Sequence, residues 1–241
     1  MGCGVKCFFA LSLPGASTDY VEYARVAIWT ARRVGFDPVL LHDGPAPDIE
    51  VDKIAIRSRF AADMEAVLTP GELAIASGAM LRLEVPWLCD DVCVYADVDT
   101  MFLRKLEVPP IGHWGMTGLS LTPAYEFNSG VCLMNPLGLR EDKESFDSYC
   151  RSVIKSSVLP KINWDEGLIN FFYLGRITRI APGWNWRPYQ GANDDAGVVH
   201  FHGPKPLDSQ DRIVTCYNRA LWPTEFYEQR AAWLAVREAI G

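Results

Sequence analysis

Two aspartates separated by one residue follow an apolar run that reads Val-Cys-Val-Tyr-Ala, residues 92–96. A run without alternation is typical of a central strand that is buried on both faces. Side chains alternate along a strand, so Asp97 and Asp99 leave its carboxyl end on the same side. Ligands bind at the carboxyl ends of strands in open α/β sheets, and paired carboxylates suit Mg²⁺ or Mn²⁺, which can bridge to a diphosphate. The spacing alone also occurs by chance, so a metal-dependent enzyme acting on a nucleotide diphosphate is a hypothesis that needs further support.

Arg82 and the Asn128-Ser129-Gly130 sequence are further candidates, and each allows two interpretations. Arg82, near the end of a predicted helix, is either a surface cation favoured by the helix dipole or a contact for a donor phosphate or sugar. The Asn-Ser-Gly sequence interrupts an apolar run. It is either a bulge in a buried strand, or a place where Gly130 lets a ligand approach the backbone and Asn128 offers its amide to sugar hydroxyls.

Two later segments carry acids and imidazoles in suggestive positions. Asp165 could cap a helix with Glu166 in its first turn, or both carboxylates could face a pocket at the edge of the sheet. His200 and His202 leave a short apolar strand and precede Lys205. One imidazole could complete a metal site, and the lysine could supply a positive charge for phosphate.

The elements that must position these residues begin with strand, helix and strand, the opening of a parallel sheet. No G-x-G-x-x-G or P-loop follows the first strand, which argues against NAD(P) and ATP chemistry.

The loop Trp184-Asn185-Trp186-Arg187 is suited to stacking on a base or sugar. The tail helix is either core or a self-association face. We predict strands over 5–13, 38–42, 178–181 and 198–201. We predict helices over 20–34, 69–83, 140–158 and 222–240. The first helix is capped within 17–19 and stopped by Gly35, and Thr69 is the N-cap of the second.

The composition excludes several classes of protein. A net charge of −7 without a long basic run argues against nucleic acid as a partner. The apolar N-terminus is short and contains Lys6, so we predict no signal peptide, and no run is long enough to span a membrane. Seven cysteines include two pairs with a three-residue gap, 3/7 and 89/93, which could suggest metal. We favour buried free thiols in a cytoplasmic protein.

Four separated stretches resemble, in order, the family 8 glycosyltransferases, which include glycogenin and the bacterial lipopolysaccharide galactosyl- and glucosyltransferases. The resemblance extends over about residues 78–206. The segment Met80-Leu81-Arg82-Leu83 also fits the family pattern. The four stretches are 95–99 (Tyr-Ala-Asp-Val-Asp), 127–135, 165–170 (Asp-Glu-Gly-Leu-Ile-Asn) and 200–206 (His-Phe-His-Gly-Pro-Lys-Pro).

The resemblance implies a type-A glycosyltransferase fold: one α/β domain with a Rossmann-like N-terminal half and a mixed, mostly parallel central sheet. It would divide into a nucleotide-binding half (about 1–103), a donor-sugar and acceptor half (about 104–221) and a C-terminal helix (about 222–241). The implied activity is retaining transfer of a hexose from a UDP-sugar, UDP-Glc or UDP-Gal, to a glycan or other hydroxyl acceptor, with Mn²⁺ or Mg²⁺. The residues that resemble the family's site are Asp97, Asp99 and His200 for metal, Arg82, Asp97, Asn128, Ser129, Gly130, Gly203 and Lys205 for the donor, and Asp165 and Glu166 for catalysis.

The sequence departs from the family pattern at three points. The glycine-to-lysine spacing before Pro206 is one residue short, which makes His202 a rival ligand to His200. Position 166 is Glu where the bacterial members usually have Gln; Glu166 is either a nucleophile or, as we favour, a stabiliser of an oxocarbenium-like state. The first strand also lacks the acid that often holds uracil, which leaves the base open.

Two alternative functions remain. A sugar-phosphate nucleotidyltransferase should show a Gly-rich basic loop after its first strand, and the sequence has none. A non-catalytic carbohydrate-binding protein would tolerate loss of the metal. The acceptor and the oligomeric state are not predicted, because variable loops bind acceptors.

Overall fold

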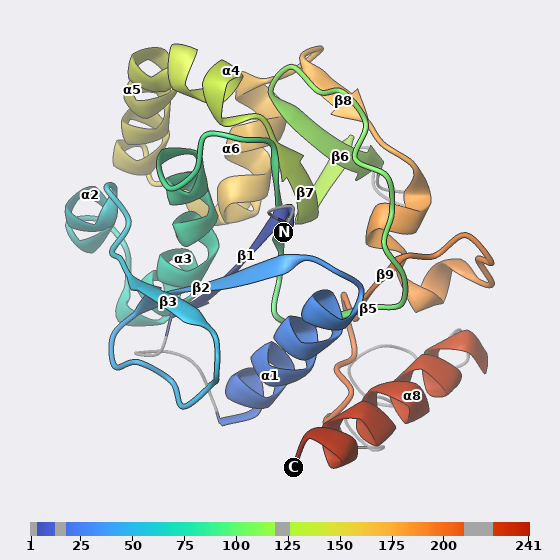
Figure 1. Cartoon of the computed structure of the whole chain (residues 1–241). Coiled ribbons are helices and arrows are strands. Elements are labelled where there is room, and N and C mark those ends of the chain that lie inside the picture. Colours follow the sequence, from blue (N-terminus) through green and yellow to red (C-terminus); the bar gives the residue numbers. More distant parts are fainter. Residues whose placement is uncertain (1–3, 13–17, 119–125, 210–223) are drawn as a thin grey trace.

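A single seven-stranded sheet crosses the molecule, with helices packed on both of its faces (Figure 1). The computed structural model describes residues 4–12, 18–118, 126–209 and 224–241. The strand order is β3-β2-β1-β4-β7-β6-β8, and a second, two-stranded sheet pairs β5 with β9. The strands are β1 (Lys6–Ser12), β2 (Asp37–Asp43), β3 (Asp52–Ala55), β4 (Cys93–Ala96), β5 (Thr100–Phe102), β6 (Trp114–Gly118), β7 (Phe127–Met134), β8 (Ile177–Arg179) and β9 (Val198–His200).

The sheet is parallel in its N-terminal half and mixed beyond it. β1 pairs in parallel with β2 and β4, and β2 with β3. β7 is antiparallel to both β4 and β6, whereas β6 and β8 are parallel. Consequently the start of β7 lies at the same edge as the ends of β1, β4, β6 and β8. The predicted mixed, mostly parallel sheet is confirmed.

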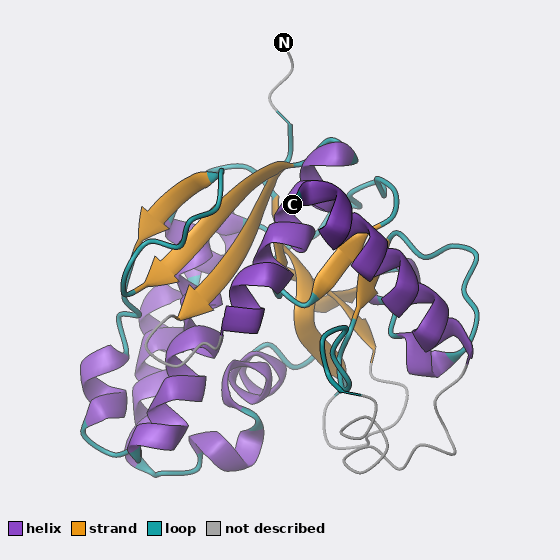
Figure 2. Cartoon of the chain, turned by 90° about the horizontal axis from the view of Figure 1, so that it is seen from below, coloured by secondary structure: helices purple, strands orange, loops and turns teal. Residues whose placement is uncertain are grey.

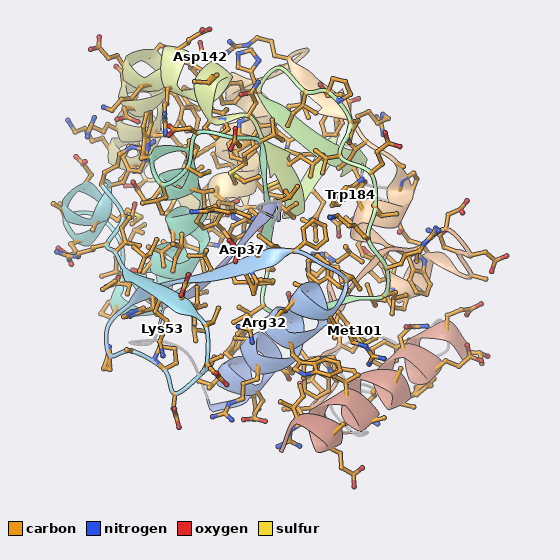
Figure 3. All side chains as sticks on the ribbon, viewed as in Figure 1. Arg32, Asp37, Lys53, Met101, Asp142 and Trp184 are labelled. Atoms are coloured by element: carbon orange, nitrogen blue, oxygen red, sulfur yellow. The ribbon has the colours of Figure 1, made fainter. Side chains whose placement is uncertain are left out.

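Alternating side chains build two hydrophobic cores, one on each face of the sheet. In β1, Phe9 and Leu11 pack toward α1 (Thr18–Arg33) and α8 (Thr224–Ile240). Phe8 packs on the other face, against α3 (Pro70–Met80), α5 (Lys143–Lys155) and α6 (Trp164–Phe172). Figure 2 shows the sheet between these two groups of helices. Because both faces are covered, the strands carry near-continuous apolar sequence.

Helix boundaries follow capping signals. Thr69 caps α3 in a reciprocal capping box with Glu72, and Pro70 follows at the first helical position, as predicted. The α-helix ends at Met80, however, and Leu81–Trp87 continues as a 3₁₀ helix, η1, that contains Pro86. The predicted end at 83 was therefore wrong, because proline does not fit the interior of an α-helix.

The predicted helix over 140–158 is two helices. α4 (Pro136–Glu141) begins earlier, where the Asn135 side chain caps it and proline takes the first turn. α5 starts at Lys143, after a break at Asp142. The sequence analysis also missed β3, β6 and the short helix α2 (Ala61–Glu65). The remaining short elements are η2 (Leu159–Ile162), η3 (Pro182–Asn185) and η4 (Pro188–Gln190).

The other predicted strands and helices are present, with ends that differ by a few residues. The turn expected at Pro14-Gly15, the cap candidate Ser17 and the first two residues of the predicted tail helix lie outside the described residues. Among the helices that the structure describes, none has the length and apolar character that crossing a membrane requires.

Candidate metal and donor site

Polar side chains gather where the sheet's strands end beside α3. A cavity of about 350 Å³ opens there, between the end of β1 and α3. Arg82, Asp97 and Asp99 line it together with apolar residues of β1 and α3, and Ser12 and Tyr20 line it as well. The topology explains the gathering, because the carboxyl end of β4 lies next to that of β1.

Asp97, Asp99 and His200 form a cluster whose potential ligand atoms all lie within 4.8 Å of one another. His200 Nε2 is 3.4 Å from Asp99 Oδ1 and 3.9 Å from Asp97 Oδ2. The pairing of β5 with β9 brings this about, since it sets Thr100 opposite His200. His202 is not in the cluster; its exposed ring contacts the Tyr189 hydroxyl.

The imidazole of His200 is held in one orientation by a chain of amides. His200 Nδ1 lies 2.9 Å from Asn185 Oδ1, and Asn185 Nδ2 donates to Asn128 Oδ1 at 2.8 Å. With Nδ1 held by the amide oxygen, Nε2 faces the two aspartates, and in the neutral ring its lone pair is available to a metal. An imidazole oriented in this way is the usual form of a metal-binding histidine.

The charge state of Asp99 also fits a divalent cation. Burial opposes its ionisation, but Lys205 and His200 hold the pKa of the carboxyl well below its usual range. Its Oδ1 atom is buried and faces His200 Nε2 at 3.4 Å. Two carboxylates and one imidazole match the donor set of a cation such as Mn²⁺ or Mg²⁺.

Gly130 leaves room for this cluster. A Cβ atom at this position would lie 2.1 Å from His200 Cε1 and 2.9 Å from Asp97 Oδ2. The Gly130 carbonyl also accepts the Asp97 N–H at 2.7 Å. The glycine is therefore required for close approach between β7 and the cluster.

Arg82 lies at the centre of the site rather than at the surface. Only 5% of the residue is exposed. Its guanidinium pairs with Asp97 at 2.9 Å and with Asp165 at 3.0 Å, and it donates to the Ser129 carbonyl. It also stacks on the ring of Tyr95, 4.6 Å from the centroid. Arg82 thus joins β4, β7 and α6, and the interpretation as a surface cation was wrong.

Asp165 and Glu166 enter the site from the first turn of α6, both buried. Glu166 Oε2 accepts from Asn128 Nδ2 at 2.8 Å and from the Ser129 N–H at 3.2 Å, and Oε1 accepts from Asn163 Nδ2 at 3.0 Å. Burial, and after it the carboxylates of Asp97 and Glu166, raise the pKa of Asp165 to about 7 in spite of the nearby Arg82.

Asn128 is a structural bridge. Its NH₂ group donates to Glu166, and its oxygen accepts from Asn185 and from the Gly130 N–H. The chain His200–Asn185–Asn128–Glu166 therefore links the metal cluster to the acidic helix start. A direct contact of Asn128 with a sugar stays a prediction.

Lys205 contacts the Asp99 carboxylate and donates to the Phe201 carbonyl at 2.8 Å. The turn before it uses the left-handed φ of Gly203, +112°. Despite the shortened spacing, the lysine therefore reaches the metal cluster. Whether it binds a diphosphate stays a prediction.

The prediction that the loop 184–187 stacks on a base or sugar was wrong, because Trp184 and Trp186 are buried in the core. Sequence reasoning did not assign roles to Asn163 and Tyr95, whose hydroxyl donates to Asp97 at 3.1 Å. Asn163 takes a left-handed conformation, with φ of 55°, that turns the chain into α6. The contact of Asn185 with Asn128 joins residues 57 apart in the chain, so local spacing does not predict it, whereas the Tyr95–Asp97 and Asn163–Glu166 contacts are local and were missed.

Comparison of the structure with solved structures gives strong matches to glycosyltransferases. The galactosyltransferase LgtC in complex with donor and acceptor sugar analogues matches with a TM-score of 0.60 and 15% identity, over 94% of this chain and 95% of that one. WbbM, a bifunctional glycosyltransferase, matches with a TM-score of 0.61 and 14% identity over 95% of this chain, which spans 52% of the WbbM chain. GlyE from Streptococcus pneumoniae TIGR4 matches with a TM-score of 0.61 and 12% identity, over 98% of this chain and 63% of that one.

No protein-family model matches the sequence, and a search of curated proteins gave no match either. The resemblance to the family 8 glycosyltransferases is thus confirmed at the level of the fold.

Proposed function

Because the chain has the type-A glycosyltransferase fold, we propose that it is a metal-dependent, retaining glycosyltransferase. It would move a hexose from UDP-Glc or UDP-Gal to a hydroxyl group of a glycan or other acceptor. The observation that carries this proposal is the cluster of Asp97, Asp99 and His200 at the mouth of the 350 Å³ cavity, with Asp165 and Glu166 nearby. Five described cysteines are free, which supports the cytoplasmic location that we include in the proposal.

Asp97, Asp99 and His200 would hold Mn²⁺ or Mg²⁺. When bound, such a cation acts as a Lewis acid that neutralises the charge of a leaving diphosphate. Lys205 and Arg82 contribute fixed positive charge at the same edge. Lys205 would exchange its contact with Asp99 for the phosphate oxygens when donor and metal arrive.

Glu166 would stabilise positive charge on the sugar rather than attack it. Three neutral donors occupy its two oxygens, which orients the carboxylate and lowers its tendency to form a covalent bond. The acceptor hydroxyl would then attack on the face that the diphosphate leaves. One solved structure with the same fold is an active-site Gln-to-Glu variant of LgtC, at a TM-score of 0.63 and 15% identity.

The nucleoside would occupy the cavity between β1 and α3. Ser12 lies there with a buried hydroxyl oxygen that has no partner, and it can donate to a base or ribose oxygen in place of the missing acid. The Tyr20 ring, 40% exposed, offers a stacking surface.

A donor screen by thermal shift tests the proposal. UDP-Glc, UDP-Gal, UDP-GlcNAc and GDP-sugars are each added with Mn²⁺ and with EDTA. We expect one UDP-sugar to raise the melting temperature and to be hydrolysed only with metal, because a ligand that binds the folded state stabilises it by mass action.

The matched variants are Asp99→Asn, which removes a predicted ligand, and Asp195→Asn, which removes the same charge from a side chain that is 95% exposed. The first should abolish the shift and the second should keep it. If no nucleotide sugar binds in the presence of metal, the proposed function is wrong.

A further inference from the structure

We propose that Arg187 binds the carboxylate of an acidic acceptor sugar. Arg187 follows η3, and only 1% of it is exposed. Its Nη2 donates to the Gly118 carbonyl at 2.9 Å. Its Nε and Nη1 atoms are buried and have no hydrogen-bond partner. Among the residues that the structure describes, no carboxylate forms an ion pair with this guanidinium.

A buried cation without a counter-ion is rare, because desolvation of the charge is expensive. The other deeply buried arginine, Arg82, has two carboxylate partners. An unpartnered group of this kind in a folded protein needs an explanation, and a missing anionic ligand is the simplest one.

Arg187 lines a second cavity, of about 250 Å³, at the same edge of the sheet as the metal cluster. The ends of β6 and β8 and the segment after them form its walls. Thr117 lines it as well, and the Thr117 hydroxyl is also buried without a partner. Two guanidinium nitrogens and one hydroxyl without partners therefore belong to residues that line a space with room for a small polar group, below the ~300–1,000 Å³ of larger ligand pockets.

The fork of an arginine matches a planar carboxylate, whose two oxygens accept parallel N–H bonds. A neutral sugar hydroxyl would leave the positive charge unpaired. Entry of the ligand requires the η4 segment to move, because the Tyr189 ring lies 5.9 Å from the guanidinium carbon. We therefore infer that binding displaces Tyr189 or Gln190 from above Arg187.

The second cavity lies next to the proposed reaction centre. Asn185 lines it and, through Asn128, connects to Glu166. The pKa of Tyr189 is raised by burial, lowered by the charge of Arg187 and by a side-chain hydrogen bond with it, and raised by Glu166, so this ring lies near both charges. The first cavity, by contrast, contains the metal cluster's aspartates and the proposed nucleoside site.

Asn128 and Asn185 would therefore lie between a group bound at Arg187 and the diphosphate. The second substrate, the acceptor, would enter on the Arg187 side. This assignment to the acceptor rests on the proposed function. The binding of an anion at Arg187 does not.

The experiment measures binding of methyl β-glucuronide, methyl α-galacturonide and the two matching neutral glycosides, methyl β-glucoside and methyl α-galactoside. Dissociation constants come from NMR titration of the Mn²⁺ and UDP-loaded protein, with ¹⁵N-labelled arginine side chains. We expect at least one acid to bind roughly tenfold or more tightly than its neutral counterpart. We also expect it to shift the Arg187 Nε–H signal.

Arg187→Met should remove the preference for the acid and leave the neutral sugar's affinity unchanged. Arg187→Lys keeps the charge but loses the fork, and should keep only part of the preference. The matched control is Arg176→Met, which removes one positive charge from an arginine that already pairs with Asp142 and does not line the cavity.

Two results would overturn the inference: no acid is preferred, or the preference survives in Arg187→Met. The Nε–H signal of the wild type gives a direct answer even if that variant does not fold. A parallel titration compares UDP-glucuronate with UDP-Glc; selective loss of the former in Arg187→Met would assign the carboxylate to the donor and overturn the acceptor assignment. If UDP itself fails to bind, the proposed function fails, while acid binding at Arg187 is still measured without it.

Discussion

At the scale of single residues, the site places two carboxylates against one arginine and a third carboxylate close to them. Arg82 pairs with Asp97 and Asp165, and Glu166 follows directly in the chain. The cation cannot neutralise all three acids, so the most deeply desolvated one has the raised pKa, about 7 at Asp165. This crowding makes the metal-free protein sensitive to pH.

The folded pKa of Asp165 lies above its unfolded value, so between about pH 4 and 7 the unfolded state binds fewer protons. The free energy of unfolding should therefore fall as the pH rises through this range, and level off above it. Urea titrations at pH 5 and pH 8 in EDTA, compared between wild type and Asp165→Asn, measure the effect. We expect the variant to lose this dependence; an unchanged difference between the two proteins at both pH values would show that Asp165 does not titrate there.

Glu166→Gln distinguishes the two catalytic roles. If the side chain only stabilises the transition state, the variant should keep turnover within roughly tenfold, since an amide oxygen can still accept the Ser129 N–H. Loss of all but a trace of turnover, with donor binding intact, would instead favour a covalent intermediate. Single-turnover kinetics with the donor found in the screen separate chemistry from binding.

Replacing Arg187 should make the protein more stable, which is the opposite of the usual effect of changing a buried residue. Two of its guanidinium nitrogens lack partners, which opposes folding, so Arg187→Met should raise the free energy of unfolding by about 1–3 kcal/mol, less the contributions of the hydrogen bond to Gly118 and of the contacts with Tyr189. Urea titration at neutral pH measures this. A variant less stable than wild type would mean that the guanidinium has partners in solution that satisfy it.

At the scale of elements, the site depends on how closely β7 approaches β9. Gly130→Ala should displace the His200 ring, because the new Cβ would overlap it. We expect a loss of about 1–3 kcal/mol in stability and a more than tenfold loss in Mn²⁺ affinity, measured by urea titration and by competition with a chelator. Gly71→Ala is the control: it lies in α3 with nothing within 4 Å of the new atom, and should leave metal binding unchanged.

Elements that carry local signals were predictable from the sequence. The strand before Asp97 and the capped helix at Thr69 both have neighbours in the chain that specify them. At Gly130 the bulge interpretation agrees with the register shift between β6 and β7, but the close approach of His200 was not predicted. β6 was not predictable, because Trp-Gly-Met-Thr-Gly has neither alternation nor a continuous apolar run, and its pairing with β7 fixes it as a strand.

The same distinction holds within the site. The metal cluster was predictable because its aspartates share one strand end and its histidine lies in a recognisable segment. The bridging roles of Asn128 and Asn185 depend on a contact between residues 57 apart in the chain. The lack of hydrogen-bond partners at Nε and Nη1 of Arg187 depends on which side chains the fold places around them. Neither can be derived from spacing.

At the scale of the whole molecule, α8 stabilises both the fold and the site. Trp233 is fully buried against α1, with its ring 5.5 Å from that of Tyr23. Arg230 on the same helix donates to the carbonyls of Pro206 and Asp208, next to Lys205. The tail helix is thus core, one of the two roles that its pattern allows.

Trp233→Ala should lower the free energy of unfolding by about 3–5 kcal/mol and also weaken Mn²⁺ binding, because it loosens the helix that holds the Lys205 segment. Ile154→Ala removes a fully buried side chain from the core on the other face. It should destabilise the protein by about 2–5 kcal/mol without changing the affinity of the remaining folded molecules for metal. Equal metal affinities in both variants would show that α8 has no influence on the site.

The pairing of β5 with β9 also sets the moment at which a newly made molecule can become active. Asp97 and Asp99 leave the ribosome roughly 100 residues before His200. The parallel half of the sheet can begin to form during synthesis, as N-terminal segments commonly do. The metal cluster cannot be completed until β9 has been made and has paired with β5, which brings His200 to the two aspartates.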